Sequence, residues 1–301
     1  MREALPHLAM ILAVTFWSSS STAIKFILPV IPVFEAVSFR FVIAAALLWL
    51  VVLAARQLRY LKAVGWQPYF AGMIDPGVIA IMAYVGLTMT TAVHAVVIFS
   101  TMPLLASVIG RVFLKEPLTL PVFGGALLGL GGTVLLLSSS LVTSNASLIG
   151  DALLIGAVIL VCFAQLVLRR VARDRGRPIV ITALMISGAA TIGLIALGIF
   201  GTTRPLAWIE FANTDIWLVF LYSATVISAA AFFLYNFALR HMHMGRVSLY
   251  SVLQAPLGVS LAAAVLGESV SDGEMAGIAL VITGVALPAL HRAIQLRRAA
   301  S

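Results

Sequence analysis

The sequence predicts an all-α integral membrane protein whose ten transmembrane helices form two inverted five-helix repeats. Three observations lead to this prediction: the apolar composition, a long stretch that occurs twice, and a one-sided distribution of lysine and arginine. Hydrophobic residues make up 62% of the 301 residues and charged residues only 10%. Water-soluble domains of this length do not have that balance, so we expect the chain to lie in a lipid bilayer.

A stretch in the first half of the chain recurs in the second half. Residues 103–132 read PLLASVIGRVFLKEPLTLPVFGGALLGLGG, and residues 256–284 read PLGVSLAAAVLGESVSDGEMAGIALVITG. The pairs that align at one common offset are Glu116 with Glu268, Gly125 with Gly277, and Gly132 with Gly284. Because this offset is about half the chain length, the sequence predicts two copies of one unit, residues 1–145 and residues 146–301.

Ten apolar windows have the length of a transmembrane helix, since about 20 apolar residues cross roughly 30 Å of hydrocarbon. The windows are 8–28, 34–54, 67–87, 93–114, 120–140, 148–169, 179–200, 214–236, 246–266 and 273–291. The connectors between them are too short for a soluble catalytic domain, so the function is expected to reside within the membrane. We expect no cleavable signal peptide, because few residues precede the first window and that window is long enough to span the membrane.

Lysine and arginine lie almost entirely on one side of this predicted bundle. If the N-terminus is cytoplasmic, the outer loops contain only Arg204 of the 19 Lys and Arg residues, while Lys25 and Arg40 fall within spans near their outer ends. This bias predicts that both termini are cytoplasmic, in a cell membrane that would be the inner membrane of a bacterium. It assigns the net charge of +8 to basic loops facing anionic lipid, with no nucleic-acid partner.

The two halves must lie antiparallel, because each contains five spans, which is an odd number. A repeat of this kind is typical of transporters, because two halves that exchange conformations open a central site to one side of the membrane at a time.

Several motifs resemble those of the drug/metabolite transporter superfamily, specifically its EamA-like branch. They are FWSSSSTAIK in the first span, SFRF in the second, and the two copies of the repeated stretch with FLKE and LGE at their turns. The resemblance implies ten helices, two inverted repeats and transport of small solutes, commonly export of amino acids, including aromatic ones, and related metabolites. The superfamily also includes nucleotide-sugar, sugar-phosphate and drug carriers. The second-half counterpart VCFAQLVLRR lacks the tryptophan and the serines, so the halves are not expected to line a cavity symmetrically.

The polar run of the first span is the first candidate for a substrate site. Residues 17–22 place a tryptophan, four serines and a threonine at mid-depth, where such groups face protein or a water-filled cavity rather than lipid. Trp17 and Ser21 are four residues apart and therefore share a helix face. The alternative is tight helix packing, with each serine hydroxyl bonded to its own helix.

Three charged residues lie near the outer ends of the first two spans. Lys25 is expected either to attract a carboxylate at an outer mouth or to extend toward the interface. Glu35 and Arg40 are expected to form a local ion pair.

Asp75 is the candidate for proton coupling. It lies roughly 12 Å from the start of its helix at 1.5 Å per residue, and Pro76 follows it, where a kink is expected. A carboxyl group buried at this depth can take up a proton. The alternative is an acid that stabilises the kink or an interface between helices.

Further candidate substrate contacts are uncharged polar groups on other spans: Tyr84, His94, Gln165, Tyr250 and Gln254. His94 is alternatively a structural histidine. Such groups, together with aromatic rings, suit a zwitterion or another small polar solute, whereas a phosphate would call for Arg or Lys in the cavity. A bulky, flat drug remains an alternative.

The glycine-rich fifth and tenth spans are expected to be a packing scaffold. Gly125 and Gly129 form a GxxxG motif, which lets two helix backbones approach closely. Glu116 and Glu268 at the preceding turns are expected to cap the helices that follow, with a role in transport as the alternative.

No motif for catalysis, nucleotide hydrolysis or metal binding is present. The sequence lacks GxxxxGK[ST], HExxH, CxxC and GxSxG. We therefore predict no enzyme activity, no catalytic residues, no cofactor and no metal, and we predict a monomer or weak homodimer whose partners are a small solute and the bilayer.

The leading hypothesis is an alternating-access exporter of amino acids or related metabolites. The alternatives are a multidrug or nucleotide-sugar carrier and, from another class, an intramembrane enzyme or sensor.

Overall fold

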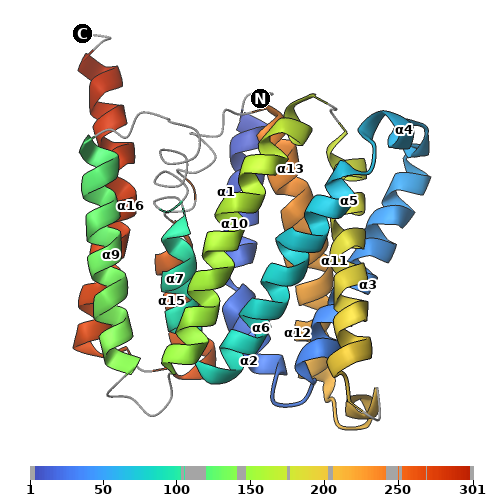
Figure 1. Ribbon diagram of the computed structural model, residues 1–301, viewed down its shortest axis with the longest axis horizontal. Helices are drawn as coiled ribbons and strands as arrows, with labels where there is room; N and C mark the ends of the chain where they lie inside the picture. Colours follow the sequence, from blue (N-terminus) through green and yellow to red (C-terminus); the bar gives the residue numbers. More distant parts are fainter. Residues whose placement is uncertain are drawn as a thin grey trace.

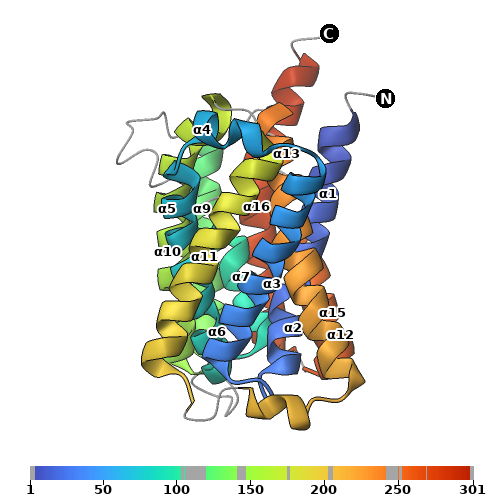
Figure 2. The ribbon, with the colours of Figure 1, turned by 90° about the vertical axis from the view of Figure 1, so that its right-hand side faces the viewer.

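The computed structural model describes residues 4–102, 105, 120–140, 147–174, 177–202, 206–241, 250, 253–268 and 270–298. Within these ranges all regular structure is helical, and the helices stand side by side in one bundle (Figures 1 and 2). The first-half helices are α1 (Ala4–Ser18), α2 (Ser20–Ile27), α3 (Val33–Ala54), α4 (Leu61–Val64), α5 (Gln67–Gly72), α6 (Ile79–Met89), α7 (Ala92–Ser100) and α9 (Leu120–Ser140). The second-half helices are α10 (Leu148–Asp174), α11 (Pro178–Phe200), α12 (Thr214–Tyr222), α13 (Ala231–His241), α15 (Gln254–Leu266) and α16 (Asp272–Arg298).

Five helical stretches of the described chain are long and apolar enough to cross a membrane. They are Leu5–Ile27, Val33–Ala54, Gln67–Met89, Pro178–Phe200 and Thr214–His241. Shorter apolar helices occupy four more of the predicted windows: Phe123–Gly132, Leu148–Ala164, Leu257–Leu266 and Met275–Gly284. The predicted windows 93–114 and 246–266 lie partly outside the described residues.

Local sequence signals explain where several helices begin and end. The Thr91 hydroxyl accepts a hydrogen bond from the His94 amide at 3.2 Å and caps α7. The Asn213 side chain caps α12 in the same way, accepting from the Ile216 amide at 3.0 Å. Pro178 stands in the first turn of α11, where its missing N–H leaves no bond unmade. Gly267 ends α15 with a φ of +64°, which glycine adopts without steric cost.

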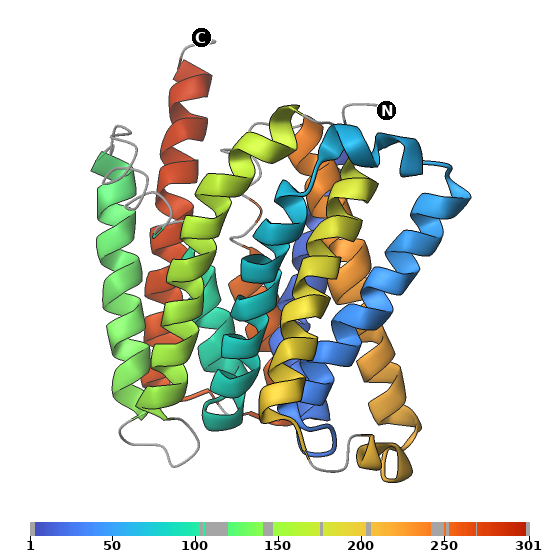
Figure 3. The same ribbon diagram turned by 45° about the vertical axis from the view of Figure 1, so that its right-hand side comes forward.

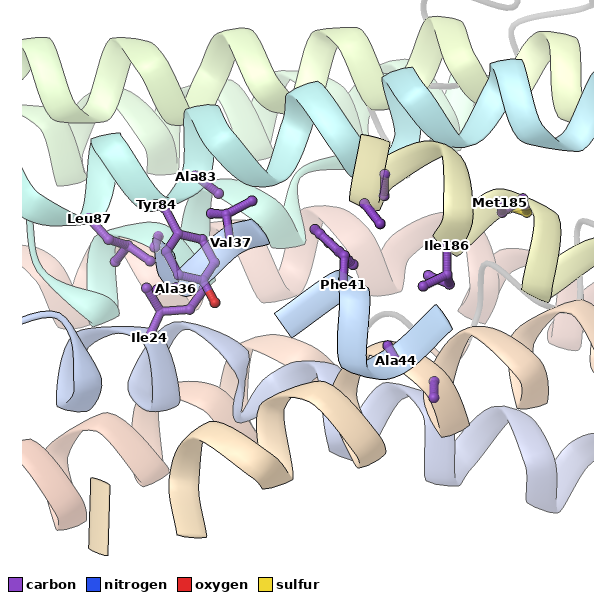
Figure 4. Packing of buried hydrophobic residues seen from close by; sticks show 14 of the residues in the cluster. Ile24, Ala36, Val37, Phe41, Ala44, Ala83, Tyr84, Leu87, Met185 and Ile186 are labelled. Atoms are coloured by element: carbon purple, nitrogen blue, oxygen red, sulfur yellow. The ribbon is translucent and has the colours of Figure 1, made fainter. Parts of the chain in front are cut away.

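The centre of the core lies between α3 and α11, which run side by side. Figure 4 shows Phe41 and Ala44 of α3 near Met185 and Ile186 of α11, and a neighbouring group in which Tyr84 and Leu87 meet Ile24, Ala36 and Val37. Small residues let α5 approach α11 closely. A Cβ atom at Gly72 would overlap the Met185 carbonyl, and a Cβ atom at Gly188 would overlap the Tyr69 carbonyl. This contact sets the position of the segment that follows α5.

Helices α9 and α16 form a pair at one edge of the bundle (Figures 1 and 3). Their glycines meet reciprocally: a Cβ atom on Gly132 would lie 2.6 Å from the Gly277 carbonyl oxygen, and one on Gly284 would lie 2.5 Å from the Gly125 carbonyl oxygen. The close backbone approach expected from the GxxxG motif is therefore present.

Helices that correspond under the sequence repeat run in opposite directions. The chain descends along α1 and α9 in Figure 1, whereas it ascends along α10 and α16. The start of α1 and the end of α16 lie at the same end of the bundle in all three ribbon views. We call the opposite end, where α6 meets α7, the turn end.

Candidate functional site

Two long helices are interrupted at corresponding places in the two halves. A π-helical segment, η2 (Met73–Val78), joins α5 to α6, and a second, η4 (Ser223–Ala230), joins α12 to α13. The offset that aligns the sequence repeats also superimposes most of these two segments. Segments of this kind frequently lie at functional sites, and interruptions at matching positions of two membrane repeats point to a binding site. The side chains around η2 and η4 are therefore the first candidates for the site.

Asp75 lies where the first of these helices breaks. Its φ of −121° and ψ of 107° are not helical, and Pro76 follows it, so the expected kink is present. Pro76 and Gly77 are buried, and η2 packs against α11. The Asp75 side chain is partly buried, and no group in the described part of the chain donates a hydrogen bond to its carboxylate. A carboxylate in this position is available to a proton or a ligand.

Arg40 connects α3 to both neighbouring helices of the site. Its Nε donates to Ser228 Oγ of η4 at 2.5 Å, and its Nη1 donates to Tyr84 Oη of α6 at 3.0 Å. The guanidinium also lies 5.5 Å from the centre of the Phe41 ring. Arg40 is only 5% exposed, and Tyr84 is fully buried. The site thus contains a buried cation held by neutral hydroxyl groups.

The expected ion pair between Glu35 and Arg40 is wrong. The Glu35 carboxylate instead accepts hydrogen bonds from Thr202 Oγ1 at 2.7 Å and from the Leu206 amide at 2.9 Å. Five residues rotate a helix by about 140° beyond a full turn, so Glu35 and Arg40 point to different sides of α3.

His94 forms a fully buried pair with Asp151 of α10. Its Nδ1 lies 3.0 Å from Asp151 Oδ2, and both side chains are 0% exposed. The Thr90 hydroxyl donates to Asp151 Oδ1 at 2.6 Å. This network connects the turn between α6 and α7 to the second repeat. Across the described residues, no three His, Cys, Asp or Glu side chains are grouped as a metal site requires.

The same turn is held by two opposite charges. The Lys25 ammonium of α2 donates to the carbonyls of Leu87 and Thr90, at 2.9 and 2.5 Å, where α6 ends. The Glu268 carboxylate, just after α15, accepts from the amides of Ala92 and Val93 at 2.9 and 3.0 Å, where α7 begins.

A cation at a helix C-terminus and an anion at a helix N-terminus each complement the helix dipole and the free backbone groups. We call these two side chains the turn clamp. Glu268 therefore caps α7 of the other half, which corrects the expectation that it caps the following helix. The corresponding Glu116 lies outside the described residues.

An aromatic cluster lies along α1. The Trp17 ring is 5.2 Å from both Phe232 and Tyr235 of α13. Tyr250 packs in the same cluster, and its hydroxyl forms a hydrogen bond with His7 Nδ1. Two of the predicted substrate contacts, Trp17 and Tyr250, thus pack against the same hydrophobic cluster, although they are far apart in sequence.

The serine run coincides with the break between α1 and α2. The Ser18 and Ser19 hydroxyls donate to carbonyls of their own helix, at 2.8 and 2.7 Å. The Ser19 hydroxyl also lies 2.9 Å from that of Tyr222 on α12. Ser21 is buried, and the buried Thr22 hydroxyl has no hydrogen-bond partner in the described structure. Much of the run therefore serves helix packing, and Thr22 retains an unused hydroxyl.

Comparisons with known proteins identify the family. The model of the EamA-like transporter family matches residues 4–138 and again residues 148–289. The chain belongs to the EamA-like transporter family. As a member, it is an integral membrane protein and a transporter of small molecules, and the family is one of transporters rather than enzymes. A solved structure titled "Crystal structure of protein" has a similar fold, with a TM-score of 0.69, 20% identity, and coverage of 98% of this chain and 99% of the other. The comparison with curated proteins finds no match.

The predicted substrate contacts of this EamA-like transporter do not form one cluster. Tyr84 lies beside Arg40, and His94 is paired with Asp151, whereas Trp17 and Tyr250 lie in the aromatic cluster. Ser21 is buried on α2, and Gln254 is partly buried at the start of α15. Asp75 lies at the helix break near α11, and the side chain of Gln165 lies outside the described part.

Two residues of the site, Asp151 and Ser228, were missed by sequence reasoning, and a third, Arg40, was given the wrong partner. Asp151 is buried although it lies in the first turn of α10, and the sequence signal for it was an acid inside a predicted span. Ser228 is one of several serines in apolar helices and carries no signal of its own. Arg40 was noticed, but it was assigned to a partner on the wrong face of its helix.

Proposed function

We propose that this EamA-like transporter exports amino acids or related small metabolites by alternating access. The observation that carries the proposal is the double match of the family to the two halves of the chain. A transporter of small molecules with two related halves has the means to expose one site to each side in turn.

The inverted arrangement of the halves, with repeats at 1–145 and 146–301, is supported by three features. Corresponding helices run in opposite directions (Figure 1). The glycine contacts between α9 and α16 are reciprocal. The interrupted segments η2 and η4 occur at equivalent positions and pack on α11 and α3, respectively, which are themselves equivalent. A ten-helix protein with a two-fold axis in the membrane plane accounts for all three.

The turn clamp supports a conformation closed at the turn end. Lys25, Glu268 and the pair of His94 with Asp151 tie the α6–α7 turn to three other parts of the bundle. In the proposed cycle, these contacts separate when the central site opens to that side. The contacts are polar and exchangeable with water, so they can break and re-form during transport.

The distribution of charge supports an orientation. The end of the bundle that holds both described chain ends carries basic residues, among them Arg56, Arg59 and Lys62. The turn end carries acids on its surface, among them Glu210, Asp215 and Asp272. By the positive-inside rule, the first end is cytoplasmic and the turn end is external, in a bacterial inner membrane.

Substrate counterflow in proteoliposomes tests the proposal. Purified protein is reconstituted, loaded with one unlabelled amino acid at a time, and assayed for uptake of the labelled form. We expect accumulation of at least one amino acid, with a preference for apolar or aromatic side chains, because aromatic rings surround α1. Uptake of a drug or a nucleotide sugar, with no amino acid transported, would reject the substrate assignment.

A further inference from the structure

Arg40 is a charged residue in the interior of a membrane protein. It is the eighth residue of α3 and lies about 10 Å from the start of that helix at 1.5 Å per residue. Only 5% of its surface is exposed. A cation at this depth is costly unless an anion or water compensates it, and it therefore marks a functional position.

No carboxylate neutralises Arg40 in the described structure. Three acids are engaged elsewhere: Glu35 with Thr202 and Leu206, Asp151 with Thr90 and His94, and Glu268 with the amides that begin α7. No ion pair joins Asp75 to Arg40 among the described residues. A guanidinium has five N–H groups, and those of Arg40 are used for one bond to Ser228 and one to Tyr84. The other described contacts of the guanidinium are the Phe41 and Tyr84 rings, whose centres lie 5.5 and 5.8 Å from its central carbon. No described anion balances the charge, and most of the N–H donors have no described acceptor.

The two hydroxyl partners orient the guanidinium rather than neutralise it. Ser228 Oγ donates its own proton to the Ser223 carbonyl at 3.0 Å and accepts from Arg40 Nε. This fixes the Arg40 side chain on the interrupted segment η4. Tyr84 Oη accepts from Arg40 Nη1, and its proton has no acceptor in the described part of the chain. The pair thus offers guanidinium N–H groups together with a phenol O–H.

We propose that Arg40 and Tyr84 bind the carboxylate of the transported solute, an inference that rests on the proposed function and specifies its substrate class. A planar carboxylate matches the fork of N–H donors, and it accepts the phenol proton as well. One cation balances one carboxylate charge. The other described cation of this region, Lys25, is bound to the carbonyls that end α6, so a phosphate dianion would not be neutralised here.

The pair of Arg40 and Tyr84 is buried where the two halves of the chain meet. Tyr84 and Ser228 belong to different halves of the chain, and both contact Arg40. The two hydroxyl groups orient the guanidinium. The carboxylate reaches it when α6 and η4 move apart, which makes this contact part of the transport cycle.

The experiment compares one solute with and without its carboxylate. Counterflow of L-phenylalanine and of L-phenylalaninamide is measured for the wild type and for Arg40→Gln, with Arg59→Gln as the control, because Arg59 is exposed on the loop after α3. We expect the wild type and the control to prefer the acid by at least about ten-fold, the value of one charge-assisted contact. Arg40→Gln is expected to bring the ratio close to one. An unchanged ratio in Arg40→Gln would overturn the proposal.

A second variant provides an independent test in case Arg40→Gln does not fold. Tyr84→Phe removes only the hydroxyl, and it is expected to lower the acid-to-amide ratio several-fold. Tyr84→Phe with the wild-type ratio would remove Tyr84 from the site.

Thermal melting of the purified protein separates this proposal from the proposed function. The wild type and Arg40→Gln are titrated with the amino acids, with phenylacetate and with phenylacetamide. Stabilisation of the wild type by carboxylates, absent in Arg40→Gln, supports the Arg40 site even if no amino acid is transported. Amino-acid counterflow with no carboxylate-specific stabilisation would sustain the transport function and refute the site.

Discussion

At the scale of single residues, the ionisable groups within the bundle have distinct surroundings. Glu268 and Lys25 neutralise helix ends, and His94 and Asp151 contact each other. Asp75 differs, because nothing described donates to its carboxylate and the backbone around it is broken. An acid without such support can change its protonation state at little structural cost, which favours a role in proton coupling over a purely structural one.

Replacing Asp75 by Asn is expected to abolish the dependence of transport on a pH gradient while leaving counterflow intact. The amide keeps the size and polarity of the side chain but cannot bind or release a proton. Initial rates in proteoliposomes with and without an imposed gradient measure the effect, and Glu210→Gln, on an exposed turn, is the control. Gradient-stimulated flux in the Asn variant equal to that of the wild type would dismiss Asp75 as the coupling residue.

At the scale of helices, the contacts between the halves are of two kinds. The pair of α9 and α16 is joined by glycines whose backbones touch, which leaves no freedom to slide. The α6–α7 turn is joined to α2 and to the end of α15 by hydrogen bonds of the turn clamp. The glycine contacts suit helices that stay together during transport, whereas the hydrogen bonds of the turn clamp suit a contact that opens.

Gly284→Leu is expected to destabilise the protein by about 1–3 kcal/mol, since overpacking forces the backbones of α9 and α16 apart. The matched control is Gly131→Leu in the same pair, where an added Cβ atom meets nothing within 4 Å. Melting temperatures in detergent distinguish the two, with a clear decrease only for Gly284→Leu. Equal melting temperatures would show that the glycine contact is dispensable.

Glu268→Ala is expected to open the turn end, because the first amides of α7 lose their acceptor. A cysteine introduced at Ala92, which is buried, reports this opening by reaction with a membrane-impermeant maleimide, after the native buried Cys162 has been replaced. We expect slow labelling with Glu268 present and several-fold faster labelling with alanine. A cysteine at Glu210 should react at the same rate in both backgrounds, and protection of position 92 in the alanine variant would contradict the clamp.

At the scale of the whole molecule, the directions of the helices and the distribution of basic residues lead to the same arrangement. Equivalent helices of the two halves run in opposite senses, and the basic end of the bundle is the end that holds the start of α1 and the end of α16 (Figure 2). The odd number of spans predicted for each half requires this combination.

A cysteine at Arg59 is therefore expected to be shielded from an impermeant reagent in intact cells, whereas one at Glu210 is labelled. Reporter fusions to the N- and C-terminal ends should both show a cytoplasmic location. Fusions that report opposite sides would refute the inverted repeat, and with it the exchange of conformations on which alternating access depends.

Much of the fold was predictable because its signals are local or repeat at one offset. Helix windows follow from runs of apolar residues, and helix ends follow from Pro178, Asn213 and Gly267. The candidate site was predictable only in part. Tyr84 and His94 were selected as polar groups in apolar spans, but their partners Arg40 and Asp151 were not assigned to them.

The sequence alone determined that this protein is a membrane protein of helices with two related halves, because hydropathy, length and internal repetition are properties of the chain itself. Only the tertiary structure decided which groups the charged side chains contact. Arg40 joins Ser228, and Glu268 joins the start of α7, across separations of well over a hundred residues. Such partners depend on how helix faces pack, and a side chain five residues along a helix already faces a different neighbour.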